Sequence, residues 1–203
     1  MDWSVSHSLN HFFYVNDGVE DPVLEYVSLA IILFLGMCLV VAAFARHERG
    51  KPVRRTAVAA GFSAGLALLI GKIITQFYDR PRPFVAHPHA IHLFLAHAPD
   101  ASFPSDHALA SAAIVTAILL RRYWGWGLFV LVFTAILDFG RVALGLHYPT
   151  DVLGGAAIGV LSALVLNLHP LRDWINAISD FVGGIWDRIT DPVLGRVASP
   201  RRA

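Results

Sequence analysis

The stretch YVSLAIILFLGMCLVVAAFA, residues 26–45, holds twenty residues without a single charged side chain. A helix needs about 20 predominantly apolar residues to span the hydrocarbon core of a bilayer. Further apolar runs follow along the chain at residues 56–78, 105–120, 124–140 and 152–168. Together these runs predict an all-α fold, an integral membrane helical bundle of about five transmembrane helices.

The composition of the whole chain points the same way. Of the 203 residues, 56% are hydrophobic and 15% are charged, whereas a soluble domain carries roughly a quarter charged residues. This balance argues against a soluble globular protein, a disordered chain and a nucleic-acid-binding protein. A single cysteine, Cys38, excludes an intramolecular disulfide and any multi-cysteine metal site.

The two ends of the chain are too polar to span a bilayer. Residues 1–24 lack the basic flank and apolar core of a cleavable signal peptide. Near the other end, apolar side chains recur at helical spacing: Trp174, Ile178, Phe181, Val182, Ile185, Trp186 and Ile189. This stripe predicts an amphipathic helix that either lies on the membrane surface or packs against the bundle. We therefore expect an amphipathic N-terminal segment at 1–24, a transmembrane domain at 25–169 and an amphipathic tail at 170–203.

Lysine and arginine are unevenly distributed over the predicted loops. Twelve of the 16 basic residues fall on one side of a five-span topology: Arg46, Arg49, Lys51, Arg54, Arg55, Arg121, Arg122, Arg172, Arg188, Arg196, Arg201 and Arg202. The positive-inside rule makes this side cytoplasmic, so residues 1–24 and the loop 79–104 lie outside. The other four basic residues sit at the outer ends of spans or in outer loops: Lys72, Arg80, Arg82 and Arg141. The positive-inside rule does not explain why basic residues occur on this side. Ionisable groups at membrane depth indicate a functional site.

Three polar segments meet at this predicted outer face. They are KIITQFYDRPRPF at residues 72–84, FPSDH at 103–107 and GRVALGLHYPTD at 140–151. Together they supply cations, two imidazoles, a carboxylate and the start of a helix. Phosphoryl transfer needs this inventory: positive charge on the phosphoryl oxygens, a nucleophile, and an acid for the leaving group. The sequence therefore predicts a phosphate-binding catalytic site outside the cytoplasm.

The second segment has the features of an anion-binding helix start. Ser105 follows a proline and is a favoured N-cap for the third span. The free N–H groups of a helix start bind anions, and His107 lies in the first turn of this helix. The plainer alternatives are that Ser105 only caps the helix and that His107 is an interfacial side chain.

The third segment predicts a nucleophile. His147 follows Arg141 by a short turn, and Asp151 comes four residues after His147. A carboxylate at this spacing is expected to hold the imidazole in the tautomer that attacks phosphorus. The plainer alternatives are that Asp151 only caps the fifth span and that Arg141 only pairs with Asp138.

These three segments resemble the signature of the type 2 phosphatidic acid phosphatase superfamily. That signature reads Lys, six residues, Arg-Pro; then Pro-Ser-Gly-His; then Ser-Arg, five residues, His, three residues, Asp. The match runs from about residue 72 to residue 151, and the surrounding spans fit the helical bundle of the family. The sequences RPRPF at 80–84 and ASFPSDH at 101–107 resemble those of the bacterial branch that hydrolyses undecaprenyl diphosphate.

The chain departs from this signature at three positions. Gly140 stands where the family usually has serine, and Asp106 stands where it has glycine. Nine residues separate Lys72 from Arg82 where the signature has six, so Thr75 holds the position expected for the lysine. Lys72 lies one helical turn deeper, from where its long side chain can snorkel toward the site.

The resemblance implies a metal-independent phosphatase of the bacterial cytoplasmic membrane, acting on a lipid diphosphate within the bilayer and recycling the cell-wall carrier lipid. His147 is expected to form a phosphohistidine, with His107 as general acid and Asp151 as the orienting carboxylate. The expected phosphate-binding residues are Arg141, Arg82, Arg80, Ser105, Asp106 and Lys72. No cofactor, metal or nucleic acid is implied, and the oligomeric state is left open.

The outer loop at residues 79–104 is rich in histidine. It carries His87, His89, His92 and His97. Such a tract is a candidate zinc site, but it lacks cysteine and a clear carboxylate partner. We expect this loop to act instead as a mobile lid over the substrate headgroup.

Three other functions compete with this reading. A phospholipid phosphatase acting on phosphatidic acid or phosphatidylglycerol phosphate uses the same catalytic residues, so the motifs do not separate it. A vanadate-binding haloperoxidase shares the motifs, but that activity suits a soluble chain. A channel or transporter predicts ionisable groups scattered through the depth of several spans, whereas here they cluster at one end.

Overall fold

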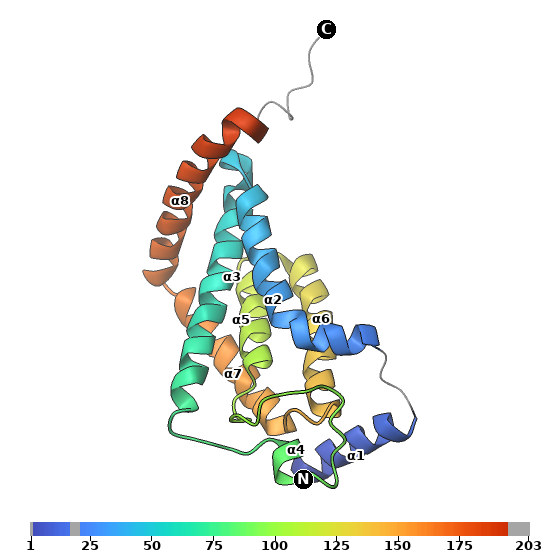
Figure 1. Cartoon of the computed structure of the whole chain (residues 1–203). Coiled ribbons are helices and arrows are strands. Elements are labelled where there is room, and N and C mark those ends of the chain that lie inside the picture. The colour runs from blue at the N-terminus through green and yellow to red at the C-terminus, as the bar shows by residue number, and fades with distance from the viewer. Residues whose placement is uncertain (1, 17–20, 195–203) are drawn as a thin grey trace.

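The computed structural model describes residues 2–16 and 21–194, and within this part every regular element is a helix. In chain order the helices are α1 (Asp2–Val15), α2 (Asp21–Phe44), α3 (His47–Ile74), α4 (Pro83–Ala86), α5 (Asp106–Leu120), α6 (Trp124–Ala143), α7 (Pro149–Leu166) and α8 (Leu171–Leu194). Figure 1 shows them as one elongated bundle. Three of the basic residues that oriented the chain lie outside the described residues: Arg196, Arg201 and Arg202.

The five predicted spans are all present as helices. Within the described residues, four helices are long and apolar enough to cross a membrane, namely α2, α3, α6 and α7. The fifth, α5, has only 15 residues and lies at the centre of the bundle, packed against α3, α6 and α7. The prediction of an all-α, multi-pass membrane protein is therefore confirmed.

Small residues bring the central helices close together. Gly155 and Gly159 of α7 face the backbone of α5, where a Cβ would lie 2.7 Å from the carbonyl oxygen of Ser105 and 2.4 Å from that of Leu109. No larger side chain fits at these two positions. Small residues at helix interfaces allow such backbone approach in membranes. As a result, the N-terminal end of α5 is held firmly against the N-terminal end of α7.

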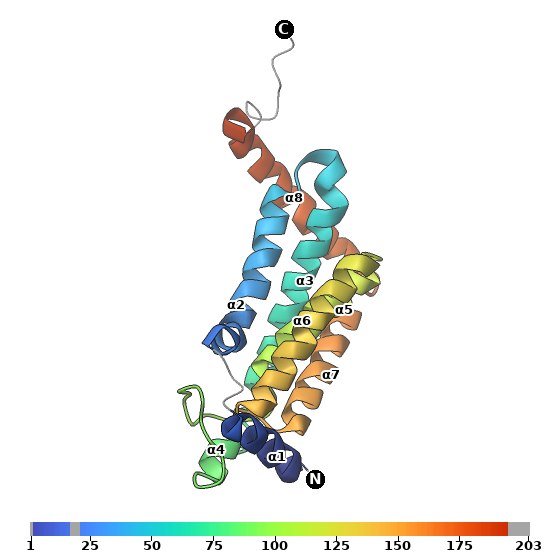
Figure 2. The same ribbon diagram turned by 90° about the vertical axis from the view of Figure 1, so that its right-hand side faces the viewer.

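The bundle has two distinct ends, which we name by their contents. The loop end carries α1, α4 and the connection at residues 75–105, and the tail end carries the start of α3 together with α8 (Figure 1 and Figure 2). At the loop end, α1 lies across the bundle. Its Asn10 is buried and donates from Nδ2 to the carbonyl oxygens of Ala143 (3.0 Å) and His92 (2.9 Å). The polar N-terminal segment is therefore a packed helix that covers the loop end.

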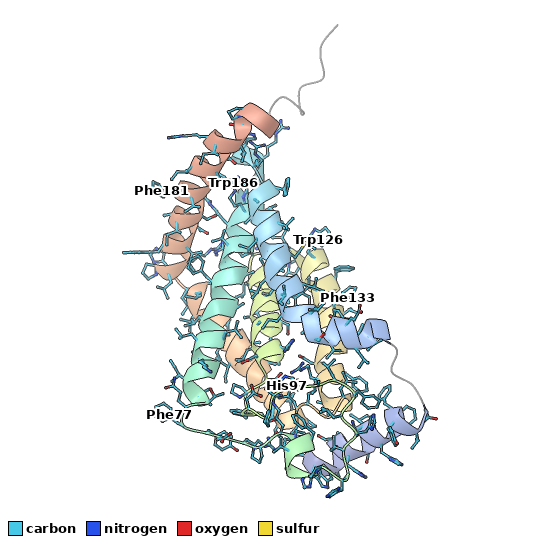
Figure 3. The ribbon with its side chains drawn as sticks, in the orientation of Figure 1. Phe77, His97, Trp126, Phe133, Phe181 and Trp186 are labelled. Carbon is cyan, nitrogen blue, oxygen red and sulfur yellow. The ribbon has the colours of Figure 1, made fainter. Side chains whose placement is uncertain are left out.

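At the tail end, α8 packs along the first half of α3. Arg54 donates to Asp187 at 2.6 Å, Arg55 donates to Asp180 at 2.9 Å, and Trp186 Nε1 donates to the carbonyl of Ala43 at 3.0 Å. Of the two predicted placements of the tail helix, packing against the bundle is thus observed. Much of its apolar stripe stays exposed, including Phe181, which points away from the bundle in Figure 3.

The ion pairs at the tail end also explain why the start of the second predicted span was placed wrongly. The second span was predicted to begin at residue 56, but α3 begins at His47 and continues through the charged residues before Thr56. These charges made the segment look like a loop. They are accommodated in a helix because the carboxylates of α8 neutralise two of its arginines.

Candidate active site

His147 is carried by a tight turn between α6 and α7. The carbonyl of Arg141 accepts hydrogen bonds from the N–H groups of Leu146 (3.1 Å) and His147 (3.2 Å). Gly145 lies in this turn with φ +75°, a conformation that a side chain disfavours. The turn folds His147 back beside the last turn of α6, where its side chain is almost completely buried.

The tautomer of His147 follows from its neighbours. Its Nδ1 lies 2.8 Å from the carbonyl oxygen of Ser102, and a carbonyl only accepts, so Nδ1 carries the hydrogen. Nε2 then presents a lone pair, which faces Nη1 of Arg82 at 3.0 Å and Nη2 of Arg141 at 3.2 Å. Burial is the main cause that lowers the pKa of His147 to about 4, so the ring is neutral at pH 7. A neutral nitrogen between two cations is suited to attack an anionic phosphoryl group.

Arg82 and Arg141 are both buried, with 5% and 2% of their surface exposed. Arg82 Nε donates to Asp100 at 2.8 Å and Nη1 donates to the carbonyl of Leu146 at 3.0 Å. Arg141 forms no ion pair among the described residues, and its Nε has no hydrogen-bond partner there. The alternative that Arg141 only pairs with Asp138 is therefore wrong. Two adjacent buried cations with spare donors favour binding of an anion.

Arg80 lies elsewhere, although it is only two residues from Arg82. Its Nη1 donates to Asp151 and Thr150, both at 2.7 Å, and its Nη2 donates to Asp2 of α1 at 2.6 Å. The guanidinium also stacks over the ring of Tyr148 at 4.0 Å. These contacts occupy the guanidinium behind Asp151. In the structure these contacts use donors of Arg80 that were expected to bind phosphate, and its role as a phosphate ligand stays a prediction.

Asp151 is fully buried and contacts His147 less directly than predicted. Its Oδ2 accepts hydrogen bonds from Ser102 Oγ (2.5 Å) and from the N–H of Tyr148 (2.9 Å), which caps α7. The distance from Oδ2 to Nδ1 of His147 is 3.8 Å, too long for a hydrogen bond. The expectation that the carboxylate itself fixes the tautomer is corrected: the carbonyl of Ser102 does so, because it lies closer to Nδ1.

The start of α5 lies beside this cluster. Ser105 is fully buried at the N-cap position, but its Oγ makes no cap hydrogen bond and has no partner among the described residues. Its N–H donates to the carbonyl of Asp151 at 3.1 Å. His107 is half-buried in the first turn, and its Nε2 is likewise without a partner in the described chain. A helix start with free N–H groups, a spare hydroxyl and a spare imidazole nitrogen can receive a phosphate.

The charges of Arg82, Arg141 and Lys72 all act on Asp106, so Lys72 and Asp106 lie within electrostatic range of the arginine pair. Lys72 is exposed in the last turn of α3, and no hydrogen bond or ion pair of its side chain appears among the described residues. Thr75 Oγ1 is turned back onto the carbonyl of Lys72 at 2.9 Å. Asp106 is exposed and points toward Gly71 of α3.

Several residues at the site were not singled out from the sequence. Ser102 and Asp100 precede the second segment, and Asp2 reaches the site from α1. Of the loop histidines, only His97 contacts the cluster, with Nε2 3.4 Å from Nη2 of Arg141. Figure 3 shows it among the side chains at the loop end. Ser102 lies within the stretch ASFPSDH at 101–107 that resembles the bacterial branch, and this was the available signal for it.

The other loop histidines point to different neighbours. The ring centroid of His87 lies 3.7 Å from that of Trp3, and the ring of His92 stacks on Tyr14 at 4.3 Å. No group of three or more metal-ligating side chains is found within residues 2–16 and 21–194.

Comparisons with known proteins show the family of the chain. The model of the PAP2 superfamily matches residues 56–174. The chain is 35% identical to undecaprenyl-diphosphatase BcrC of Bacillus subtilis (strain 168), covering 90% of this chain and 89% of that protein. It is 33% identical to bacitracin transport permease protein BcrC of Bacillus licheniformis, covering 77% of each chain. A solved transmembrane PAP2-type phosphatidylglycerolphosphate phosphatase from Bacillus subtilis has the same fold, with a TM-score of 0.57 at 20% identity and 82% coverage of both chains.

Proposed function

The chain belongs to the PAP2 superfamily, and from this premise we propose that it removes the terminal phosphate of undecaprenyl or a related polyprenyl diphosphate. The observation that carries the proposal is the lone pair of His147 Nε2, buried between the guanidinium groups of Arg82 and Arg141. The relative named undecaprenyl-diphosphatase, which the chain matches over 90% of its length, supports the choice of lipid. The reaction would return the carrier lipid of cell-wall synthesis to its monophosphate form.

The mechanism follows from the positions of the groups. His147 Nε2 attacks the terminal phosphorus, and the bond from this phosphorus to the bridging oxygen breaks. The lipid monophosphate leaves with a proton from His107, whose Nε2 is spare. Arg82, Arg141 and the first N–H groups of α5 stabilise the phosphoryl oxygens. Water, activated by His107, then hydrolyses the phosphohistidine and regenerates the neutral imidazole.

We propose that the loop end faces the outside of the bacterial cytoplasmic membrane. Residues 1–24 would then lie outside, residues 25–169 form the transmembrane phosphatase domain, and residues 170–203 lie in the cytoplasm. The arginines of α3 and α8 at the tail end support this orientation through the positive-inside rule. The exposed apolar side chains of α8, such as Trp174 and Phe181, would contact the membrane interface.

A phospholipid phosphatase is the second candidate. The solved structure of a phosphatidylglycerolphosphate phosphatase has the same fold, and the catalytic arrangement suits either substrate. The two candidates differ in the leaving group, which is a lipid phosphate in one case and a lipid alcohol in the other.

Phosphate release by the purified protein in detergent tests the proposal. The substrates are undecaprenyl diphosphate, farnesyl diphosphate and phosphatidic acid, with His147→Ala as the control. We expect the largest kcat/KM on the polyprenyl diphosphate and acid-labile label on the quenched enzyme when the terminal phosphate is radioactive. A preference for phosphatidic acid would establish the second candidate. Absence of phosphate release from all three lipids would refute both.

A further inference from the structure

We infer that Ser102 is a positioning residue for the nucleophile, acting through both its hydroxyl and its backbone carbonyl. The inference rests on the proposed function, because it concerns the formation of the phosphohistidine. It gives a role to a residue that lies outside the three segments that carry the chemistry.

Ser102 joins the three segments at one point. It is fully buried, and its N–H donates to the carbonyl of Arg80 at 2.8 Å, which ties it to the first segment. Its carbonyl accepts from Nδ1 of His147 at 2.8 Å, and its Oγ donates to Oδ2 of Asp151 at 2.5 Å. All of its polar groups are therefore used, and two of them meet the predicted catalytic residues directly.

The two contacts have different consequences for catalysis. When Nε2 bonds to phosphorus, the imidazole becomes positively charged, and a nearby carboxylate stabilises this charge more than a neutral carbonyl does. Oδ2 of Asp151 lies 3.8 Å from Nδ1, close enough for this electrostatic effect. The hydroxyl of Ser102 keeps the carboxylate there, while the carbonyl keeps the ring in the attacking tautomer.

Removal of the hydroxyl should therefore affect turnover more than substrate binding. In Ser102→Ala the carbonyl still selects the tautomer, and Arg82 and Arg141 still bind phosphate. Asp151 loses a charge-assisted hydrogen bond, so stabilisation of the phosphohistidine weakens. We expect kcat to fall by roughly 10- to 100-fold, the range for a hydrogen bond to a charged group, and KM to change by less than about twofold.

Two further variants separate this role from a purely structural one. Ser102→Thr keeps the hydroxyl and should recover most of the turnover that Ser102→Ala loses. Ser111→Ala is the matched control, because Ser111 is also buried but its Oγ has no partner among the described residues. It should keep the kcat of the wild type. Ser102→Cys, which keeps the volume but donates weakly, replaces the alanine variant if that variant loses its thermal unfolding transition.

A double-mutant cycle with Asp151→Asn completes the test, measured in single-turnover reactions at high enzyme concentration. If Ser102 acts through Asp151, adding Ser102→Ala to Asp151→Asn should lower the rate by less than about twofold. Wild-type kcat in Ser102→Ala, or losses that multiply fully in the double variant, would overturn the inference. The proposed function fails separately, when the wild-type protein itself releases no phosphate from any of the lipids.

Discussion

Arginines at the two ends of the bundle differ in the partners of their N–H groups. At the tail end, Arg54 meets both carboxylate oxygens of Asp187, at 2.6 and 3.2 Å, and Arg55 is held in the same bidentate way by Asp180. At the loop end, Arg141 meets histidine nitrogens and forms no ion pair in the described chain. The number of arginines is thus a poor guide to a site. Arg82 combines both kinds of contact, because its Nε pairs with Asp100 while its Nη1 faces His147 Nε2. The partner of each N–H group therefore distinguishes a structural contact from one that faces the proposed phosphate position.

Energetics explain why this distinction is informative. Burying a guanidinium without a carboxylate is costly, so such a group persists where a ligand or a reaction benefits from it. Arg80 shows that position alone does not decide the role. It lies at the loop end, yet Asp2 and Asp151 occupy its donors as carboxylates do at the tail end. Its contacts are thus those of an ion-paired arginine, and through Asp151 they adjoin His147.

The largest expected effect on turnover comes from replacing a histidine at the loop end, with a histidine at the tail end as the control. His147→Ala removes the proposed nucleophile, so turnover should fall by on the order of 10⁴ or more. His169→Ala, at the tail end, removes an exposed imidazole whose ion pair within the described residues is with Asp173, and it should leave turnover unchanged. Steady-state phosphate release measures both. Substantial turnover in His147→Ala would move the chemistry away from this residue.

The next largest effect should come from replacing arginine by lysine, which should change kcat/KM at the loop end and thermal stability at the tail end. Lysine keeps the charge but loses the planar fork that matches a phosphoryl group. We expect Arg141→Lys to lower kcat/KM by roughly 10²–10³, with little change in the thermal unfolding temperature. Arg54→Lys should do the reverse: an unchanged kcat/KM and a lower unfolding temperature, because its bidentate pair with Asp187 is lost. Equal effects of the two variants on kcat/KM would contradict the comparison.

A smaller effect should separate the two neighbouring arginines at the loop end. Arg82→Gln removes a proposed phosphate ligand, so inhibition by inorganic phosphate should weaken by roughly tenfold, as for loss of a charge-assisted hydrogen bond. Arg80→Gln should leave this inhibition constant unchanged and lower only kcat, since Arg80 contacts Asp151 rather than the phosphate position. The inhibition constant of phosphate is the deciding measurement. A weakened constant in Arg80→Gln would assign it to the phosphate site.

Much of the fold could be predicted from the sequence because it depends on local patterns. An apolar run of sufficient length forms a helix whatever its neighbours are: all five runs are helices, and four of them lie in helices long enough to span a membrane. The start of α3 was missed because it depends on α8. Arg54 and Asp187 lie 133 residues apart, and no local pattern reveals that one neutralises the other.

In the site, too, contacts between residues close in sequence were predictable, and contacts between distant residues were not. Arg141 and His147 are linked by a turn of a few residues, so their proximity was predictable. Ser102 and Asp151 are 49 residues apart, and Asp2 and Arg80 are 78 residues apart. A serine or an aspartate is an ordinary residue in a loop or at a helix start. Only the folded structure shows that these residues come together near His147.

The smallest expected effect is the response of stability to pH, which should again differ between the ends. The folded pKa of His147 is about 4, lowered chiefly by burial from an ordinary value of 6.5. Between these values the unfolded chain binds the proton and the folded chain does not, so stability is lost as pH falls from about 6.5 to about 4. At the tail end, the hydrogen bond from Arg55 lowers the pKa of Asp180 below 3.8. The stability that this carboxylate contributes is present above its unfolded pKa and is lost only as pH falls below about 4.

Thermal unfolding in detergent at pH values from 7 to 4.5 measures this difference. Wild type and Asp180→Asn should lose stability with the same slope in this range, whereas His147→Asn should show a shallower slope. The slope should not vanish, because burial also lowers the pKa of His97 at the same end. A slope in His147→Asn equal to that of the wild type would mean that the folded protein accepts the proton on His147. The ring would then be charged near pH 6, and the neutral nucleophile between two arginines would have to be given up.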